Sequence, residues 1–290
     1  MNAARGTLFV EDAEVVSHET HAGDQRVLRL LSPQTAAHAQ PGNFIHIQCD
    51  AAILMRRPMS IMRVERRQGQ IDILYKIHGL GTELLAKKHP GDVLNLVGPI
   101  GVPFKLSGYR PRPLLIGGGV GIPPMIFLSE HMKAQGARVK PLILMGSEVP
   151  FPFRPRPSQF LVPGIPAEVI AAMPLMEDWD FPSRLASLKS LPGCFEGYVT
   201  DLARYWLAAL DASQRADVEV FACGPTAMLR SVIALVREYQ LPCQVSLEEY
   251  MACAVGGCAG CNVRINTANG PAMKRVCVDG PVFDAAAVDF

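Results

Sequence analysis

The sequence has no dense run of Lys and Arg, and its 28 basic and 27 acidic residues leave a formal net charge of +1. Binding to nucleic acid or to an anionic membrane surface is therefore not expected. The most apolar stretch, Pro113–Leu128, is interrupted by four glycines and two internal prolines, which favours a strand, a loop and a helix over a membrane span. Met1–Glu19 lacks the basic-then-apolar order of an export signal, so we expect a cytoplasmic protein.

With 290 residues, the chain is long enough for two ordinary domains and a small third lobe. In the first hundred residues, apolar and polar positions alternate in short segments punctuated by Gly and Pro. These segments are Leu8–Val16, Arg26–Leu31, Phe44–Gln48, Ile71–Lys76 and Val93–Val97. The pattern predicts an antiparallel β-barrel domain over residues 1–106, in which only Gly81–Lys88 resembles a helix.

From Pro113 onward, strand-like and helix-like segments alternate up to residue 244. The expected strands are Leu114–Ile116, Leu142–Met145 and Val218–Ala222, and the expected helices are Pro123–Gln135, Thr200–Leu210 and Pro225–Tyr239. This alternation predicts a parallel-sheet α/β domain over residues 107–244. Nine prolines fall between Pro150 and Pro192, so residues 150–193 are expected to be an insertion or a long irregular crossing.

The last segment, residues 245–290, is predicted to be a small lobe built around a metal cluster. Its four cysteines, Cys253, Cys258, Cys261 and Cys277, follow the order Cys-x4-Cys-x2-Cys, then fifteen residues, then Cys. This is the order of [2Fe–2S] ligands in plant-type ferredoxins. Structural zinc and a disulfide pair are the alternatives, but a zinc ribbon usually has two Cys-x2-Cys knuckles and no His follows His131. Of the scattered cysteines, Cys49 and Cys194 are expected to be ordinary thiols.

Two segments of the predicted barrel, Arg57–Ser60 and Leu74–Thr82, combine into a candidate FAD site. An arginine can bind a pyrophosphate through two hydrogen bonds, and a helix that begins after glycines offers free amides to the same group. Each segment alone is weak, since Arg-Pro usually marks a turn and Gly-x-Gly-Thr a loop. Tyr75 either stacks on the flavin or fills the barrel. The candidate FAD-binding residues are Arg57, Pro58, Met59, Ser60, Leu74, Tyr75, Lys76, Gly81 and Thr82.

The candidate NAD site is the glycine-rich loop Gly117–Gly121, which lies between a predicted strand and a predicted helix. Such loops hold a pyrophosphate. Its spacing does not match the Gly-x-Gly-x-x-Gly fingerprint, so the loop alone is weak support. A second loop, Cys223–Pro225, is expected beside the same crevice because it follows a later strand. Cys223 and Met228 can also be core residues. The candidate NAD-binding residues are Gly117, Gly118, Gly119, Val120, Gly121, Cys223, Gly224, Pro225 and Met228.

Taken together, these motifs resemble the electron-transfer subunits of dihydroorotate dehydrogenase, within the ferredoxin–NADP reductase superfamily. The resemblance covers most of the chain and is carried by Arg57–Ser60, Gly81-Thr82, Gly98–Gly101, Gly117–Pro124, Cys223–Pro225, Gly197–Leu202, Glu248–Cys253 and Val276–Phe283. It implies a flavin barrel, an NAD domain and a C-terminal cluster lobe. It also implies a partner, an FMN-containing catalytic subunit that oxidises dihydroorotate for pyrimidine biosynthesis, in a heterotetramer. The proline-rich stretch departs from this pattern.

The cofactors suggest an oxidoreductase component in which no side chain acts as an acid or base, so we assign no catalytic residue. Nicotinamides exchange electrons in pairs and a [2Fe–2S] cluster exchanges them singly, and a flavin can do both. Electrons are expected to pass from the partner's flavin through the cluster and FAD to NAD. One alternative is an NAD(P)H-dependent reductase serving another redox protein. The other is a redox-sensing or regulatory module.

Overall fold

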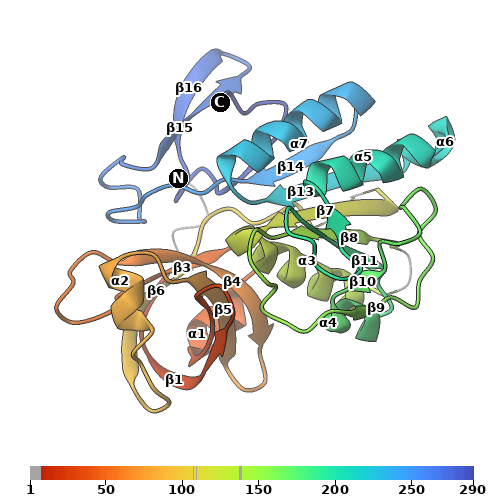
Figure 1. The fold of residues 1–290 in the computed structure, drawn as a ribbon. Helices are drawn as coiled ribbons and strands as arrows, with labels where there is room; N and C mark the ends of the chain where they lie inside the picture. The colour runs from red at the N-terminus through yellow and green to blue at the C-terminus, as the bar shows by residue number, and fades with distance from the viewer. Residues whose placement is uncertain (1–7, 107, 109, 137–138) are drawn as a thin grey trace. The chain divides into compact units, whose positions relative to one another are not determined.

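A computed structural model describes residues 8–106, 108, 110–136 and 139–290 (Figure 1). Residues 1–7, which belong to the N-terminal segment without the pattern of an export signal, lie outside the described residues. So does position 107, where a domain boundary is predicted. The chain divides into two units. The first extends to Phe104 and adds Ser246–Phe283 and Ala287–Phe290, and the second comprises Lys105–Val245 and Asp284–Ala286. The three predicted domain ranges stay predictions.

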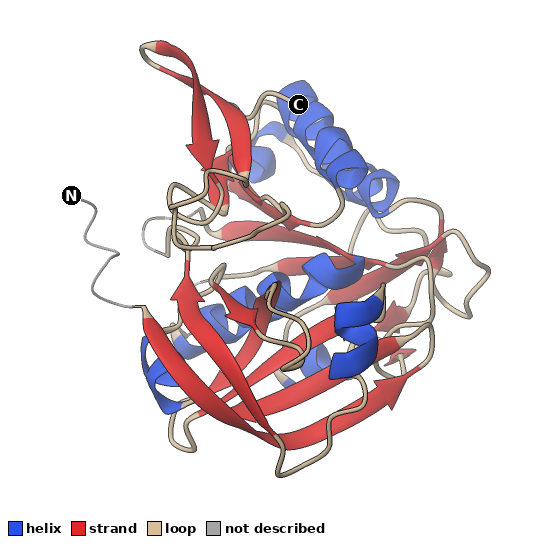
Figure 2. Cartoon of the chain, turned by 90° about the vertical axis from the view of Figure 1, so that its left-hand side faces the viewer, coloured by secondary structure: helices blue, strands red, loops and turns tan. Residues whose placement is uncertain are grey.

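Six strands of the first unit close into a barrel, in the order β1-β2-β5-β4-β3-β6, with antiparallel neighbours (Figure 2). They are β1 (Phe9–His21), β2 (Gln25–Leu31), β3 (Phe44–Ile47), β4 (Arg57–Glu65), β5 (Gln70–Lys76) and β6 (Val93–Ile100). Alternate apolar residues fill the interior, as Leu28 and Leu30 on β2 are both fully buried. The expected barrel is confirmed.

Two short helices accompany the barrel, α1 (Pro33–His38) and α2 (Leu80–Leu85). The sequence predicted only the second, which ends before Lys88. The first begins where the Glu11 carboxylate accepts hydrogen bonds from the N–H groups of Gln34 (2.9 Å) and Thr35 (2.8 Å). A helix needs partners for these N–H groups, and here the partner comes from a distant strand. No local capping residue therefore marks α1 in the sequence.

A seven-stranded sheet, most of which belongs to the second unit, has the order β12-β11-β8-β7-β13-β14-β17. Its strands are β7 (Arg112–Gly118), β8 (Leu142–Gly146), β11 (Ser183–Ser187), β12 (Phe195–Glu196), β13 (Val218–Cys223), β14 (Cys243–Ser246) and β17 (Val282–Asp284). The pairs from β12 to β13 are parallel. The main helices are η2 (Gly119–Gly121), α3 (Ile122–Ala134), α5 (Val199–Ala209), α6 (Ala212–Ala216) and α7 (Thr226–Tyr239). Figure 1 shows α5 and α7 on one face and α3 on the other, as expected for a covered parallel sheet.

Residues 147–182, which hold most of the proline-rich stretch, form an irregular crossing between two neighbouring strands of this sheet. The segment leaves β8 at Gly146 and enters β11 at Ser183, and these strands pair in parallel. On the way it forms only β9 (Arg156–Pro157), β10 (Ala171–Ala172) and the short helix α4 (Pro174–Asp178). This segment therefore connects two neighbouring parallel strands. The stretch also contains β11, which the prolines concealed.

The C-terminal lobe belongs to the same unit as the barrel. It forms a hairpin of β15 (Asn262–Thr267) and β16 (Gly270–Arg275). The segment after the hairpin is held against the end of β6, where the Val102 N–H donates to the Gly280 carbonyl at 2.6 Å. A Cβ on Gly101 would lie 2.3 Å from Pro281, so only glycine permits this approach. Within the described residues, no helix combines the length and the apolarity that crossing a membrane requires.

Candidate functional site

The four clustered cysteines lie in two pairs. The Cys258 N–H donates to the Cys253 sulfur at 3.4 Å, and the sulfurs of Cys261 and Cys277 are 3.4 Å apart. Among the described residues, no three Cys, His, Asp or Glu side chains converge on a single ion position. A tetrahedral zinc site needs four ligands around one ion, whereas a two-iron cluster takes two cysteines on each iron. The pairing fits a two-iron cluster.

Backbone amides of the cysteine loop are directed at the sulfurs. Burial raises the pKa of the Cys253 thiol, but hydrogen bonds from the N–H groups of Cys258, Val255 and Gly257 outweigh it and lower this pKa to about 7. The Gly260 N–H donates to the Cys258 sulfur at 3.4 Å. Such donors stabilise the thiolate form, which is the form that binds metal. The loop thus suits an anionic cluster.

Cys261 and Cys277 differ from the first pair because they are buried. Burial, together with the neighbouring Cys261, raises the pKa of Cys277 to about 12, while the Gly256 N–H acts in the opposite direction. The second pair is held by the hairpin, since the Val276 N–H donates to the Cys261 carbonyl at 3.0 Å. The Cys253 and Cys258 loop is therefore the exposed side of the candidate cluster, and Cys258 itself is exposed.

The two predicted FAD segments meet in the barrel unit. A Cβ on Gly81 would lie 3.0 to 3.1 Å from three guanidinium atoms of Arg57, so the arginine lies directly across the first turn of α2. Thr82 shapes that turn, because its hydroxyl accepts from the His78 N–H at 2.6 Å and donates to the Gly79 carbonyl at 3.1 Å. A cation beside helix amides is an arrangement that fits a pyrophosphate.

The β5 residues predicted for FAD contribute differently. The Tyr75 ring is 2% exposed and its hydroxyl lies 2.9 Å from Nε2 of His18, which favours barrel packing over flavin stacking. His18 Nδ1 lies 2.8 Å from the Lys88 carbonyl, and since a carbonyl only accepts, Nδ1–H donates in this hydrogen bond. Leu74 is also buried, whereas Lys76 is exposed. Sequence reasoning missed His18, which no local motif marks.

The two predicted NAD loops lie side by side at the carboxyl ends of β7 and β13, where Gly117 pairs with Cys223. A Cβ on Gly121 would lie 2.3 Å from the Cys223 carbonyl oxygen, and one on Gly118 would lie 2.4 Å from the Met228 sulfur. The strand order reverses between β7 and β13, and open α/β sheets bind nucleotides at such a switch point. Cys223 is 1% exposed as a whole residue, so it is part of the core beneath the loops.

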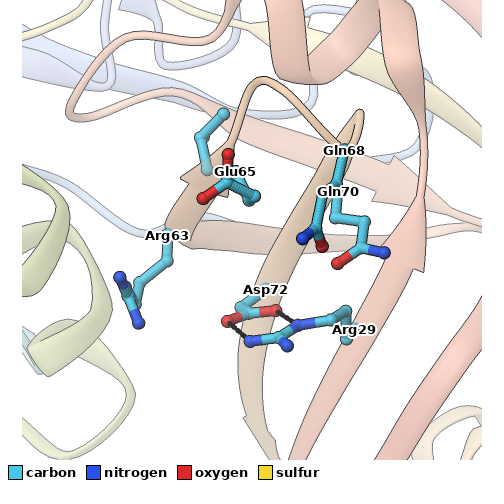
Figure 3. Close-up of a pocket in the computed structure, with 7 residues that line it drawn as sticks. Arg29, Arg63, Glu65, Gln68, Gln70 and Asp72 are labelled. Atoms are coloured by element: carbon cyan, nitrogen blue, oxygen red, sulfur yellow. Dashed lines mark hydrogen bonds and ion pairs between the residues drawn. The ribbon is translucent and has the colours of Figure 1, made fainter.

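A polar pocket of about 240 Å³ lies elsewhere on the barrel wall, and Figure 3 shows its side chains. It is lined by Arg29, Arg63, Val64, Glu65, Gln68, Gln70 and Asp72, none of which was predicted as a site residue. Arg29 binds the buried Asp72 carboxylate through two hydrogen bonds of 2.7 and 2.8 Å. This cross-strand ion pair joins β2 to β5, so we assign the pocket a structural role.

Comparisons with known proteins identify related domains and related chains. Residues 8–104 match the family model of the oxidoreductase FAD-binding domain. Residues 248–289 match the iron–sulfur cluster binding domain of dihydroorotate dehydrogenase B. Among solved structures, a chain of the NADH-dependent reduced ferredoxin–NADP oxidoreductase has a TM-score of 0.76 at 24% identity, covering 96% of this chain and 90% of that one. This similarity confirms the expected fold class.

Curated relatives resemble the chain over nearly its whole length. The electron transfer subunit of dihydroorotate dehydrogenase B (NAD(+)) from Desulforamulus reducens is 32% identical over 284 residues, which cover 94% of this chain and 96% of the relative. The same subunit from Bacillus caldolyticus is 34% identical, with 86% of each chain covered. The resemblance inferred from the motifs is confirmed, and the chain belongs to the family of dihydroorotate dehydrogenase B electron transfer subunits.

Proposed function

We propose that this protein transfers electrons between the flavin of a catalytic partner, its own [2Fe–2S] cluster and FAD, and NAD(H), in the oxidation of dihydroorotate for pyrimidine biosynthesis. The observation that carries the proposal is the paired arrangement of the four cysteines in the same unit as the Arg57 and Gly81 contact. A cluster lobe and a flavin barrel in one unit suit a protein that transfers electrons between the two groups. The family membership of the chain supports the same function.

In this proposal, the residues of the chain bind and orient the cofactors. Cys253 and Cys258 hold one side of the cluster, and Cys261 and Cys277 hold the other. The Arg57 guanidinium and the amides at Gly81 and Thr82 bind the FAD pyrophosphate, while Pro58, Met59 and Ser60 of β4 and the exposed Lys76 of β5 line the flavin. FAD, when bound, supplies the ability to exchange electrons both in pairs and singly. No side chain of the chain is required to move a proton.

The glycine loop at Gly117–Gly121 and the Cys223–Pro225 loop together form the NAD site in this proposal. Both loops consist of close-packed backbone, which lets a dinucleotide approach their amides. Met228 is half-buried, and its side chain packs against both loops, at Gly118 and at Gly224. We propose NAD rather than NADP as the nucleotide because the relatives are named as NAD(+) enzymes.

The proposed partner is an FMN-containing catalytic subunit, in a heterotetramer, because the relatives are named as electron transfer subunits of a larger enzyme. We also propose a cytoplasmic location, since thiolates that hold a cluster require a reducing compartment. Cell fractionation with an antibody to the protein checks the location.

The test is an anaerobic titration of the purified protein with NADH, followed by flavin absorbance and by low-temperature electron paramagnetic resonance (EPR). We expect the flavin to bleach and a reduced [2Fe–2S] signal to develop. Addition of the catalytic subunit should then allow dihydroorotate to reduce NAD. A protein that contains zinc, or a flavin that NADH does not reduce, contradicts the proposal.

One feature favours a second function on the same scaffold, a reductase that serves another redox protein. The irregular crossing at residues 147–182 replaces the regular connection expected between two parallel strands. The electron acceptor distinguishes the two functions. Reduction of a ferredoxin by NADH without any response to dihydroorotate and the catalytic subunit would support the second function.

A further inference from the structure

The guanidinium of Arg275 reaches the loop between the first two candidate cluster ligands. Its Nη1 donates to the Gly256 carbonyl at 3.0 Å, and its Nε lies 3.5 Å from the Asp279 carboxylate. The backbone supports this arrangement, because the Arg275 N–H donates to Asp279 Oδ2 at 2.9 Å and the Asp279 N–H donates to the Arg275 carbonyl at 2.8 Å. The side chain is therefore fixed on two sides.

Gly256 connects this cation with the second pair of cysteines. Its N–H faces the Cys277 sulfur, and its carbonyl accepts the hydrogen bond from Arg275. The position has a φ of +82°, and a Cβ there would lie 2.6 Å from Val278 Cγ2. Glycine is thus needed both for the backbone conformation and for the close approach. A shift of Gly256 would move the amide that faces Cys277.

The charge of Arg275 and the position of the Gly256 amide both affect the reduction potential of a cluster. Reduction by one electron adds one negative charge, and the potential depends on nearby charge and on hydrogen bonds to the sulfurs. A positive charge favours the reduced form, and so does an amide directed at a sulfur. Arg275 supplies the charge and fixes the amide. Asp279 has the opposite charge, and Lys274 lies 4.0 Å from its carboxylate.

We propose that Arg275 is a positioning residue that raises the reduction potential of the [2Fe–2S] cluster, by holding Gly256 toward Cys277 and by placing a positive charge beside the cysteine loop. The inference rests on the proposed function, since it takes Cys253, Cys258, Cys261 and Cys277 as the cluster ligands. It goes further because it assigns a role to a residue outside the ligand set.

The same hairpin offers a matched control. Arg264 lies on β15, and its Nε is 3.0 Å from the Asp289 carboxylate. Its side chain is 59% exposed, compared with 35% for that of Arg275. R264Q removes the same charge from the same hairpin, but it breaks an ion pair with the C-terminal segment and leaves the Gly256 contact in place.

The experiment measures the cluster midpoint potential in the full-length, FAD-loaded protein, by a dithionite titration followed by EPR. Wild type, R275Q, R275K, D279N and R264Q are compared, with iron and sulfide content measured for each. We expect R275Q to lower the potential and R275K to lower it less, because lysine keeps the charge but not the planar fork. D279N should raise it, and R264Q should leave it unchanged.

The outcomes separate this inference from the proposed function. A wild-type protein without a [2Fe–2S] signal refutes the proposed function. A wild-type cluster whose potential is the same in R275Q, or is shifted equally by R264Q, overturns the role of Arg275. If R275Q assembles no cluster, D279N decides, since a raised potential supports the inference and an unchanged one overturns it.

Discussion

Replacing Gly121 by alanine tests whether the two glycine loops form the nucleotide site. The added Cβ would lie 2.3 Å from the Cys223 carbonyl oxygen and 2.5 Å from the Gly224 nitrogen, and ordinary contact begins at 3.4 Å. Both neighbours are backbone atoms, so the loops must separate by roughly 1 Å to relieve the contact. Overpacking of this kind costs about 1–3 kcal/mol. If the loops bind the pyrophosphate, that energy weakens NADH binding by about 5-fold to about 150-fold.

The assay is the NADH concentration dependence of flavin bleaching in an anaerobic stopped-flow experiment. The free energy of unfolding is measured alongside, with Gly118→Ala as the control for packing. At Gly118 the added methyl group meets the sulfur of Met228, at 2.4 Å, and this flexible side chain can rotate away. Gly118→Ala should therefore destabilise the protein less than Gly121→Ala. A Gly121→Ala protein with unchanged NADH affinity and unchanged stability would refute the reasoning.

Three further predictions concern the barrel unit. Arg57→Gln should release FAD because it removes the cation beside the first turn of α2, whereas Arg63→Gln on the same strand should retain it; flavin fluorescence after gel filtration measures both. Cys258→Ser should abolish the [2Fe–2S] signal and leave FAD bound, and simultaneous loss of both would show that the two sites depend on each other. Although burial raises the pKa of Glu11, its hydrogen bonds outweigh that effect and lower the pKa below the ordinary 4.5. Its stabilising effect is thus present above about pH 4.5 and is lost as the pH falls through the lowered pKa. The free energy of unfolding of Glu11→Gln, measured by urea denaturation, should therefore depend less on pH in that range than that of wild type. Equal pH profiles would contradict the assignment.

The sequence predicted the elements whose signals are local. The apolar run Leu114–Ile116 lies within β7, and the helix pattern Pro123–Gln135 matches α3 to within a residue at each end. Both signals depend on hydrophobic periodicity over a continuous segment, which single sequences carry well. The cysteine spacing is local in the same sense. These signals sufficed to predict the fold class and to propose cluster ligands.

The missing parts depend on contacts between distant residues. Glu11 caps α1 from a strand more than twenty positions earlier, and the hydrogen bond between His18 and Tyr75 joins residues 57 positions apart. Arg275 and Gly256 are 19 positions apart, and although Gly256 lies within the cysteine motif, the motif does not show which side chain contacts it. Such pairs form only when tertiary structure brings the segments together. Periodicity and motif spacing therefore do not predict these contacts.

The crossing at residues 147–182 shows how a proline-rich segment can still be ordered. Prolines remove backbone donors, so buried side chains supply the missing partners. Glu177, which is 5% exposed, accepts from the Ser158 hydroxyl and the Gln159 N–H, both at 2.8 Å. Arg184, equally buried, donates to the Phe160 carbonyl at 2.6 Å. The crossing therefore has its own anchors within the second unit, and the sheet still brings the loops after β7 and β13 into close contact.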